Sequence, residues 1–83
     1  MSTTQIRRAA LSIVLNIAEG YGRKSRDDFK RFLKMSYGSV NEVEVLLELG
    51  KDLKYVKEET YRDLIERYSL LGKRIFTLIE KWK

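Results

Sequence analysis

The segment NIAEGYGRKSRDDF, residues 16–29, decides the fold because it ends one helix and begins another. Gly20 stands where a helix C-terminus favours a positive φ, so the first helix is expected to end at about Glu19. Ser25 is a typical N-cap, and Asp28 three residues later forms an approximate capping box with it. Two helices joined by so short a connection pack antiparallel.

Upstream of this segment, residues 5–19 have the apolar spacing of one helix. The stripe comprises Ile6, Ala9, Ala10, Ile13, Val14 and Ile17. Downstream, residues 26–54 form a second, longer helix with two adjacent apolar seams, which predicts neighbours on two sides. The first seam is Phe29, Leu33, Ser36, Val40, Val43 and Leu47. The second seam is Phe32, Met35, Ser39, Leu46, Leu49 and Leu53.

A third helix is expected at residues 58–82, because its apolar residues recur every 3–4 positions, as in helical bundles. They are Tyr61, Leu64, Tyr68, Leu71, Ile75, Leu78 and Trp82. The sequence therefore predicts an all-α fold: one domain, residues 1–83, that forms an antiparallel up-down bundle of three helices. Gly38 inside the second helix has two interpretations, which are a tolerated weakness or a point of close helix approach.

The composition limits both chemistry and stability. The 83 residues include no cysteine and no histidine, so disulfides, thiolate or imidazole metal sites and Cys–His catalysis are excluded. A chain of this size buries only about 60–65% of its unfolded surface, so we expect a homo-oligomer to supplement a thin core. No apolar run approaches the length of a membrane span. A cytoplasmic protein without a cofactor is the expectation.

Positive charge is concentrated in the first part of the chain. Residues 1–35 hold eight Lys and Arg against three Asp and Glu, whereas residues 36–83 hold nine of each. Such asymmetry indicates a basic face and an anionic partner. The alternative is a solvated surface, or ion pairs with Asp27 and Asp28. The candidate nucleic-acid-binding residues are Arg23, Lys24, Arg26, Lys30, Arg31 and Lys34 at the corner, with Arg7 and Arg8 at the opposite end. Tyr21 and Tyr37 are candidates for base stacking.

A polar stripe on the first helix has two interpretations. Its residues are Arg8, Ser12, Asn16 and Glu19, and Glu42 of the second helix is placed to meet them. The stripe is either a polar site or, as we favour, a hydrogen-bond network that fixes helix or subunit register. No nucleophile–base pair is recognisable among these residues, and the glutamates of the second helix lack the histidines of a di-iron bundle. We therefore expect neither catalysis nor a metal site.

Residues 5–56 resemble a bacterial four-helix-bundle family that is known from open reading frames in intervening sequences of 23S ribosomal RNA. The resemblance rests on the ordered run QIRRAALSIVLNIAEGYGR, residues 5–23, on Phe29, Phe32 and Leu33, and on Gly38, Ser39 and Glu42. The family commonly has a further helix before this run, where only MSTT stands here. The resemblance therefore implies helices 2–4 of a four-helix bundle, with one core face left uncovered.

The family is similar in fold to the accessory variability determinant of diversity-generating retroelements, a barrel-like homopentamer that partners a reverse transcriptase and nucleic acid. The resemblance implies a pentamer, while the uncovered face leaves a three-helix monomer or a dimer open. Our hypothesis is a non-enzymatic, self-associating bundle that binds nucleic acid, RNA or an RNA–protein complex more than DNA, through a basic face. The alternative is a protein–protein accessory module, for example for a reverse transcriptase.

Overall fold

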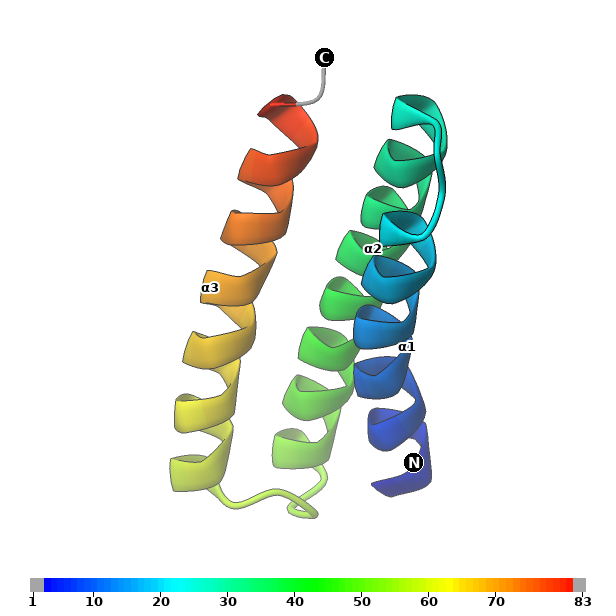
Figure 1. Ribbon diagram of the computed structural model, residues 1–83. Coiled ribbons are helices and arrows are strands. Elements are labelled where there is room, and N and C mark those ends of the chain that lie inside the picture. Colours follow the sequence, from blue (N-terminus) through cyan, green and yellow to red (C-terminus); the bar gives the residue numbers. More distant parts are fainter. Residues whose placement is uncertain (1–2, 82–83) are drawn as a thin grey trace.

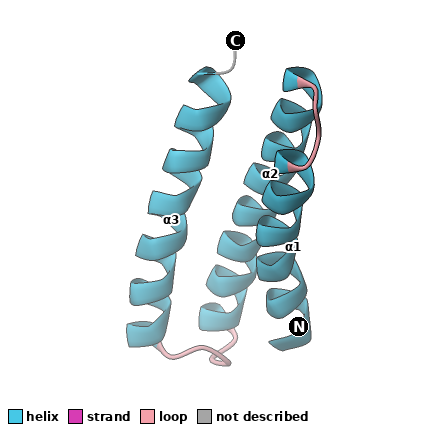
Figure 2. Cartoon of the chain, viewed as in Figure 1, coloured by secondary structure: helices cyan, strands magenta, loops and turns pink. Residues whose placement is uncertain are grey.

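The computed structural model describes residues 3–81, which form three long helices in an up-down-up arrangement (Figure 1). They are α1 (Thr3–Tyr21), α2 (Arg26–Asp52) and α3 (Glu58–Lys81). Helix α2 is central, since α1 and α3 each pack against it. Short loops join the helices at opposite ends of the bundle (Figure 2). The predicted all-α antiparallel bundle is confirmed, while Trp82 lies outside the described residues.

The core is built mainly on the first seam of α2. Leu33, Val40 and Val43 are completely buried, and Leu47 nearly so. Around them pack Ala9 and Ile13 from α1, and Ile75 and Ile79 from α3. The predicted neighbours on two sides of α2 are confirmed, because α1 and α3 both pack against it. Of the second seam, only Phe32 is buried, and about half the surface of Met35, Leu49 and Leu53 is exposed.

The start of α2 is where Ser25 predicts it. Ser25 has an extended backbone, and its Oγ accepts a hydrogen bond from the Asp28 N–H at 3.1 Å. This bond satisfies one of the backbone donors that a helix N-terminus leaves without a partner. The end of α2 comes two residues earlier than predicted, because Lys54 adopts a left-handed φ of 64°. The following N–H groups of Tyr55 and Val56 then donate to the Gly50 carbonyl.

The role predicted for Gly20 is wrong. Gly20 lies inside α1, and no glycine of residues 3–81 has a positive φ. Its importance is steric, since a Cβ at this position would lie 2.8 Å from the Cβ of Phe32 and 3.0 Å from a ring carbon of Phe29. Such distances are too short for ordinary packing, so Gly20 allows α1 to approach α2 closely. The helix ends at Tyr21, and the N–H of the next residue, Gly22, donates to the Ala18 carbonyl.

Gly38 has the opposite environment. It is exposed, and an added Cβ would meet no atom within 4 Å, so the interpretation of a close helix approach is wrong. The contact between α2 and α3 instead occurs at Gly72, where a Cβ would lie 3.3 Å from Val40. Gly38 is thus a helix weakness that no packing requirement explains.

Substituting alanine at Gly38 and Gly20 is expected to change stability in opposite directions. Gly38→Ala should stabilise the fold by about 1 kcal/mol, since alanine loses less backbone entropy in a helix. Gly20→Ala should destabilise it by about 1–3 kcal/mol, because the added methyl overpacks the contact with Phe32. Urea denaturation followed by circular dichroism at one protein concentration measures both. Equal stabilisation by the two substitutions would contradict the close approach at Gly20.

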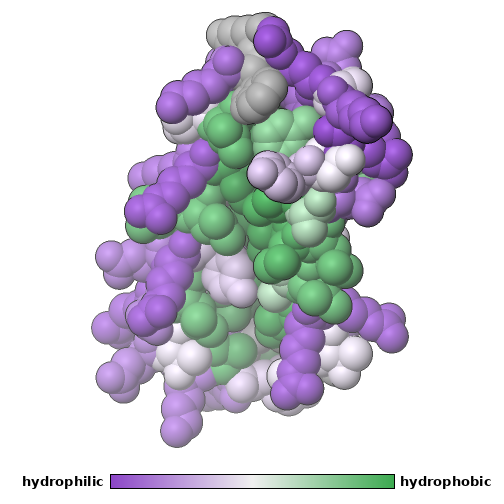
Figure 3. All heavy atoms as spheres, viewed as in Figure 1, coloured by the Kyte–Doolittle hydropathy of each residue, from purple (hydrophilic) through white to green (hydrophobic). Residues whose placement is uncertain are grey.

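One face of the bundle is apolar and uncovered. Figure 3 shows an apolar area that runs between α3 and α1 and is bordered by hydrophilic side chains. Leu64, Tyr68 and Leu71 of α3 are partly buried and pack against the core. On α1, Leu11, Val14 and Leu15 are 56–62% exposed. Contiguous apolar surface of this kind marks an interaction site.

Candidate nucleic-acid interface

The antiparallel arrangement brings the C-termini of α1 and α3 to the same end as the N-terminus of α2 (Figure 1). The middle of the bundle is marked by the Ser12–Ser39 hydrogen bond and by the contact of Gly72 with Val40. Above this level, residues 12–38 and 74–81 hold eight Lys and Arg against four Asp and Glu. Below it, residues 3–11 and 39–73 hold eight of each. We call the upper half the basic end.

Helix α3 adds Arg74 and Lys81 to the basic end. Sequence reasoning missed both, because charge counted along the chain places them in its neutral part. The signal that would have revealed them is the up-down-up topology itself. Six of the eight predicted candidates lie at this end, whereas Arg7 and Arg8 lie in the first turns of α1 at the other end, as predicted.

Two arginines of the basic end are held on the ring of Phe32. The guanidinium carbons of Arg23 and Arg31 lie 5.1 and 4.6 Å from the ring centroid. Arg23 also donates to Glu19 Oε1 at 2.6 Å, and Arg31 lies 3.6 Å from an Asp28 oxygen. The predicted alternative of ion pairing therefore applies to these arginines in part. These cation–π contacts hold the two guanidinium groups in place beside the α1–α2 interface.

Three lysines of the basic end remain unengaged. Within residues 3–81, Lys24, Lys30 and Lys34 make no hydrogen bond, ion pair or ring contact. Lys24 also lines a hollow of about 440 Å³ at the tip of the α1–α2 corner, together with Arg26 and Tyr21. Tyr21 is 83% exposed there. Unengaged lysines beside an exposed aromatic ring are the groups that phosphates and bases can contact.

The polar stripe forms a smaller network than predicted. Asn16 donates to Ser12, and Ser39 Oγ donates to Ser12 Oγ at 2.9 Å across the α1–α2 interface. The buried Ser36 hydroxyl likewise donates to the Ile13 carbonyl at 2.9 Å. These cross-helix bonds fix the register of α1 against α2.

Three predicted members lie outside this network. Arg8 and Glu42 form no hydrogen bond or ion pair with any residue of the described part of the chain. Glu19 pairs with Arg23 instead. These three residues lie outside the network because α1 and α2 approach closely. The small hydroxyl side chains then lie opposite one another, and the longer charged side chains lie in solvent.

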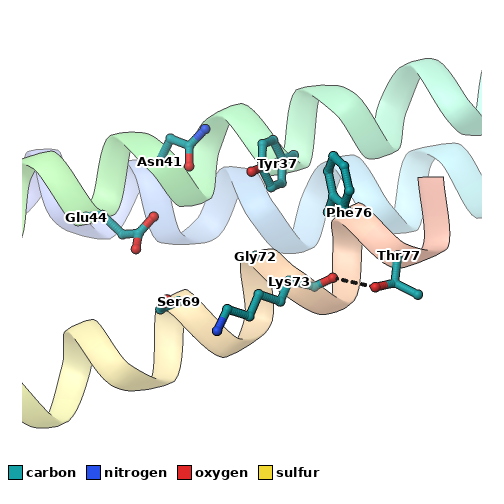
Figure 4. Close-up of a pocket in the computed structure, with 8 residues that line it drawn as sticks. All are labelled: Tyr37, Asn41, Glu44, Ser69, Gly72, Lys73, Phe76 and Thr77. Carbon is teal, nitrogen blue, oxygen red and sulfur yellow. Dashed lines mark hydrogen bonds between the residues drawn. The ribbon is translucent and has the colours of Figure 1, made fainter. Parts of the chain in front are cut away.

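A second hollow, of about 540 Å³, lies between α2 and α3 (Figure 4). Tyr37 and Phe76 meet at one end of it, with ring centroids 6.0 Å apart. Tyr37 thus faces α3 and lies away from the Tyr21 corner. In Figure 4, Asn41 and Glu44 follow along α2, and the Lys73 side chain extends along α3 toward Ser69. The hollow contains polar, aromatic and charged groups but no nucleophile–base pair.

Two further kinds of feature are absent from the described residues. Across residues 3–81, no three Asp or Glu side chains converge on a point where they could hold a metal ion. None of α1, α2 and α3 combines the length and the apolar character that crossing a bilayer requires.

A comparison with protein families tests the family resemblance that the sequence motifs implied. The sequence model of the family described as 23S rRNA-intervening sequence protein matches residues 1–77. The chain belongs to this family. The match to the 23S rRNA-intervening sequence protein family covers all of α1 and α2 and most of α3. A comparison with curated proteins found no match.

Proposed function

We propose that the protein is a non-enzymatic, self-associating helical bundle that binds RNA, or an RNA–protein complex, through its basic end. The observation that carries the proposal is the twofold excess of cations over acids at this end, with Lys24, Lys30 and Lys34 unengaged. Lysine side chains contact phosphates without reading sequence, and they release counterions when they do so. The family description, which refers to a ribosomal RNA, favours RNA as the nucleic acid.

Self-association is proposed from the uncovered apolar face between α1 and α3 and from the exposed apolar side chains of α1. A second copy that covers Leu11, Val14 and Leu15 would remove more than half of each side chain's accessible surface from water. Burial of this kind drives stable association of small domains. An oligomer would also repeat the basic end, and the summed positive potential would strengthen phosphate binding.

The same apolar face supports the alternative function, a protein–protein accessory module. A partner protein, for example a reverse transcriptase, would then cover the face in place of a second copy. The cations of the basic end would in that case keep the protein soluble and form ion pairs between subunits. This alternative requires no direct contact with nucleic acid.

Binding of a labelled RNA hairpin across a salt series, with protein mass measured by light scattering in the same samples, tests the proposal. Phosphate contacts from Lys24, Lys30 and Lys34 of each protomer predict that log K falls with log salt with a slope of about −2 to −3. Light scattering is expected to show more than one copy per particle. An intact oligomer that does not bind the hairpin at low salt would reject RNA binding and leave the accessory role. A monomer at all concentrations would reject self-association.

A further inference from the structure

The hollow between α2 and α3 displays an aromatic side chain that the core does not need. Phe76 is 51% exposed, and its ring is tilted 48° to that of Tyr37. The hollow lies where Gly72 keeps the two helices close without filling the space with a side chain. Its volume of about 540 Å³ is in the range of small-molecule sites. Asn41 of α2 and Lys73 of α3 line it from the two helices (Figure 4).

The hollow continues a line of side chains that begins at the basic end. Along α2, this line advances by alternating steps of four and three residues, so its members share one helix face. The members are Lys30, Lys34, Tyr37, Asn41 and Glu44. The two lysines are unengaged, the tyrosine ring meets Phe76, and the last two residues line the hollow. Phosphates bound by Lys30 and Lys34 would therefore lie along the same face of α2 as Tyr37.

We propose that this hollow binds one unpaired base of the RNA, with the adjoining phosphates on Lys30 and Lys34. The inference rests on the proposed function and names its substrate class: single-stranded or looped-out nucleotides. The exposed face of Phe76 stacks on the base. Bases in a duplex have their faces covered by neighbours, so they cannot enter.

The polar end of the hollow gives the base an orientation. The Asn41 amide both donates and accepts hydrogen bonds, and the Glu44 carboxylate accepts them from exocyclic amino groups. A carboxylate repels phosphate, so the backbone lies toward the lysines and the base edge toward Asn41 and Glu44. The site therefore favours bases that carry an amino group, which are adenine, cytosine and guanine, over uracil.

The test compares a single-stranded adenine 12-mer with a 12-base-pair RNA duplex on the full chain. Phe76→Ala is expected to weaken single-strand binding by about 5- to 100-fold, the range of one lost base stack, and to leave duplex affinity within about twofold. Phe76→Leu, which keeps an apolar side chain without the ring, should show the same loss. Leu70→Ala is the matched control, because Leu70 is 50% exposed on α3 and does not line the hollow. It should change neither affinity.

Lys30→Gln with Lys34→Gln separates the base pocket from the proposed function. This double variant is expected to weaken binding of both RNAs. If it does so while Phe76→Ala and Phe76→Leu bind the single strand as the unmodified chain does, the base pocket is rejected and RNA binding by the basic end stands. If the unmodified chain binds neither RNA, the proposed function and the base pocket both fail. Equal loss on single strand and duplex with Phe76→Leu would also overturn the pocket.

Discussion

Reversing Lys24 and Lys34 to glutamate is expected to lower the affinity for an RNA hairpin by on the order of 100-fold in about 0.1 M salt. A charge pair at 4 Å in water is worth about 1 kcal/mol, and reversal replaces that attraction with a similar repulsion. Screening by salt reduces the combined effect of the two sites to roughly 3 kcal/mol. Both side chains are exposed and unengaged, so the fold is expected to be unchanged.

The matched control is Arg7→Glu with Arg8→Glu. It changes net charge by the same amount, but both residues lie in the first turns of α1, away from the basic end. Both side chains are exposed and make no hydrogen bond or ion pair within residues 3–81, so stability should be kept. Fluorescence anisotropy with the same hairpin measures the four affinities of wild type, the two double variants and their combination. Equal losses for the two double variants would show that net charge, and not the basic end, governs binding.

Leu33→Ala is expected to destabilise the protein by about 2–5 kcal/mol, which is the range for a leucine removed from a closed core. Leu33 is completely buried in the first seam of α2, among side chains of all three helices. Domains of this size have a total stability of only about 5–10 kcal/mol, so the variant should be close to unfolding at 25 °C. Urea denaturation followed by circular dichroism gives the free energy of unfolding.

Leu70→Ala removes the same atoms from a half-exposed position of α3 and is expected to cost less than about 1 kcal/mol. Both variants need the same protein concentration, because self-association contributes to apparent stability. A loss below 1 kcal/mol for Leu33→Ala would mean that the core can collapse around the missing side chain. Such a result would contradict a tightly packed three-helix core.

Local sequence signals predicted the helices well. Ser25 marks the first residue of α2 because a cap acts through a hydrogen bond to a residue three positions away. The burial of Leu33 and Val40 follows from apolar spacing, since a helix turns by a fixed angle per residue. The position of Arg7 and Arg8 at the far end also followed from helix length alone. These features depend on interactions within one helix or one turn.

The candidate site was predictable only where it is continuous in sequence. Arg23 and Lys24 stood out as a cluster, but their different states, one held on Phe32 and one unengaged, depend on which helix faces lie together. Similarly, the partner of Ser12 is Ser39 and not Glu42, because close helix approach selects the shorter side chain. Glycine composition likewise could not distinguish the crowded Gly20 from the open Gly38.

The sequence by itself determined three amphipathic helices, their order and the cap that starts α2. It also determined the excess of positive charge near the loop between α1 and α2. The tertiary structure decided which seam of α2 is buried, which glycine lies in a crowded contact, and that Arg74 joins the basic end. It also decided that Tyr37 and Phe76 meet beside a hollow in line with Lys30 and Lys34. The physical reason is range: helix periodicity and capping act over a few residues, whereas these pairings depend on distances between segments that only packing brings together.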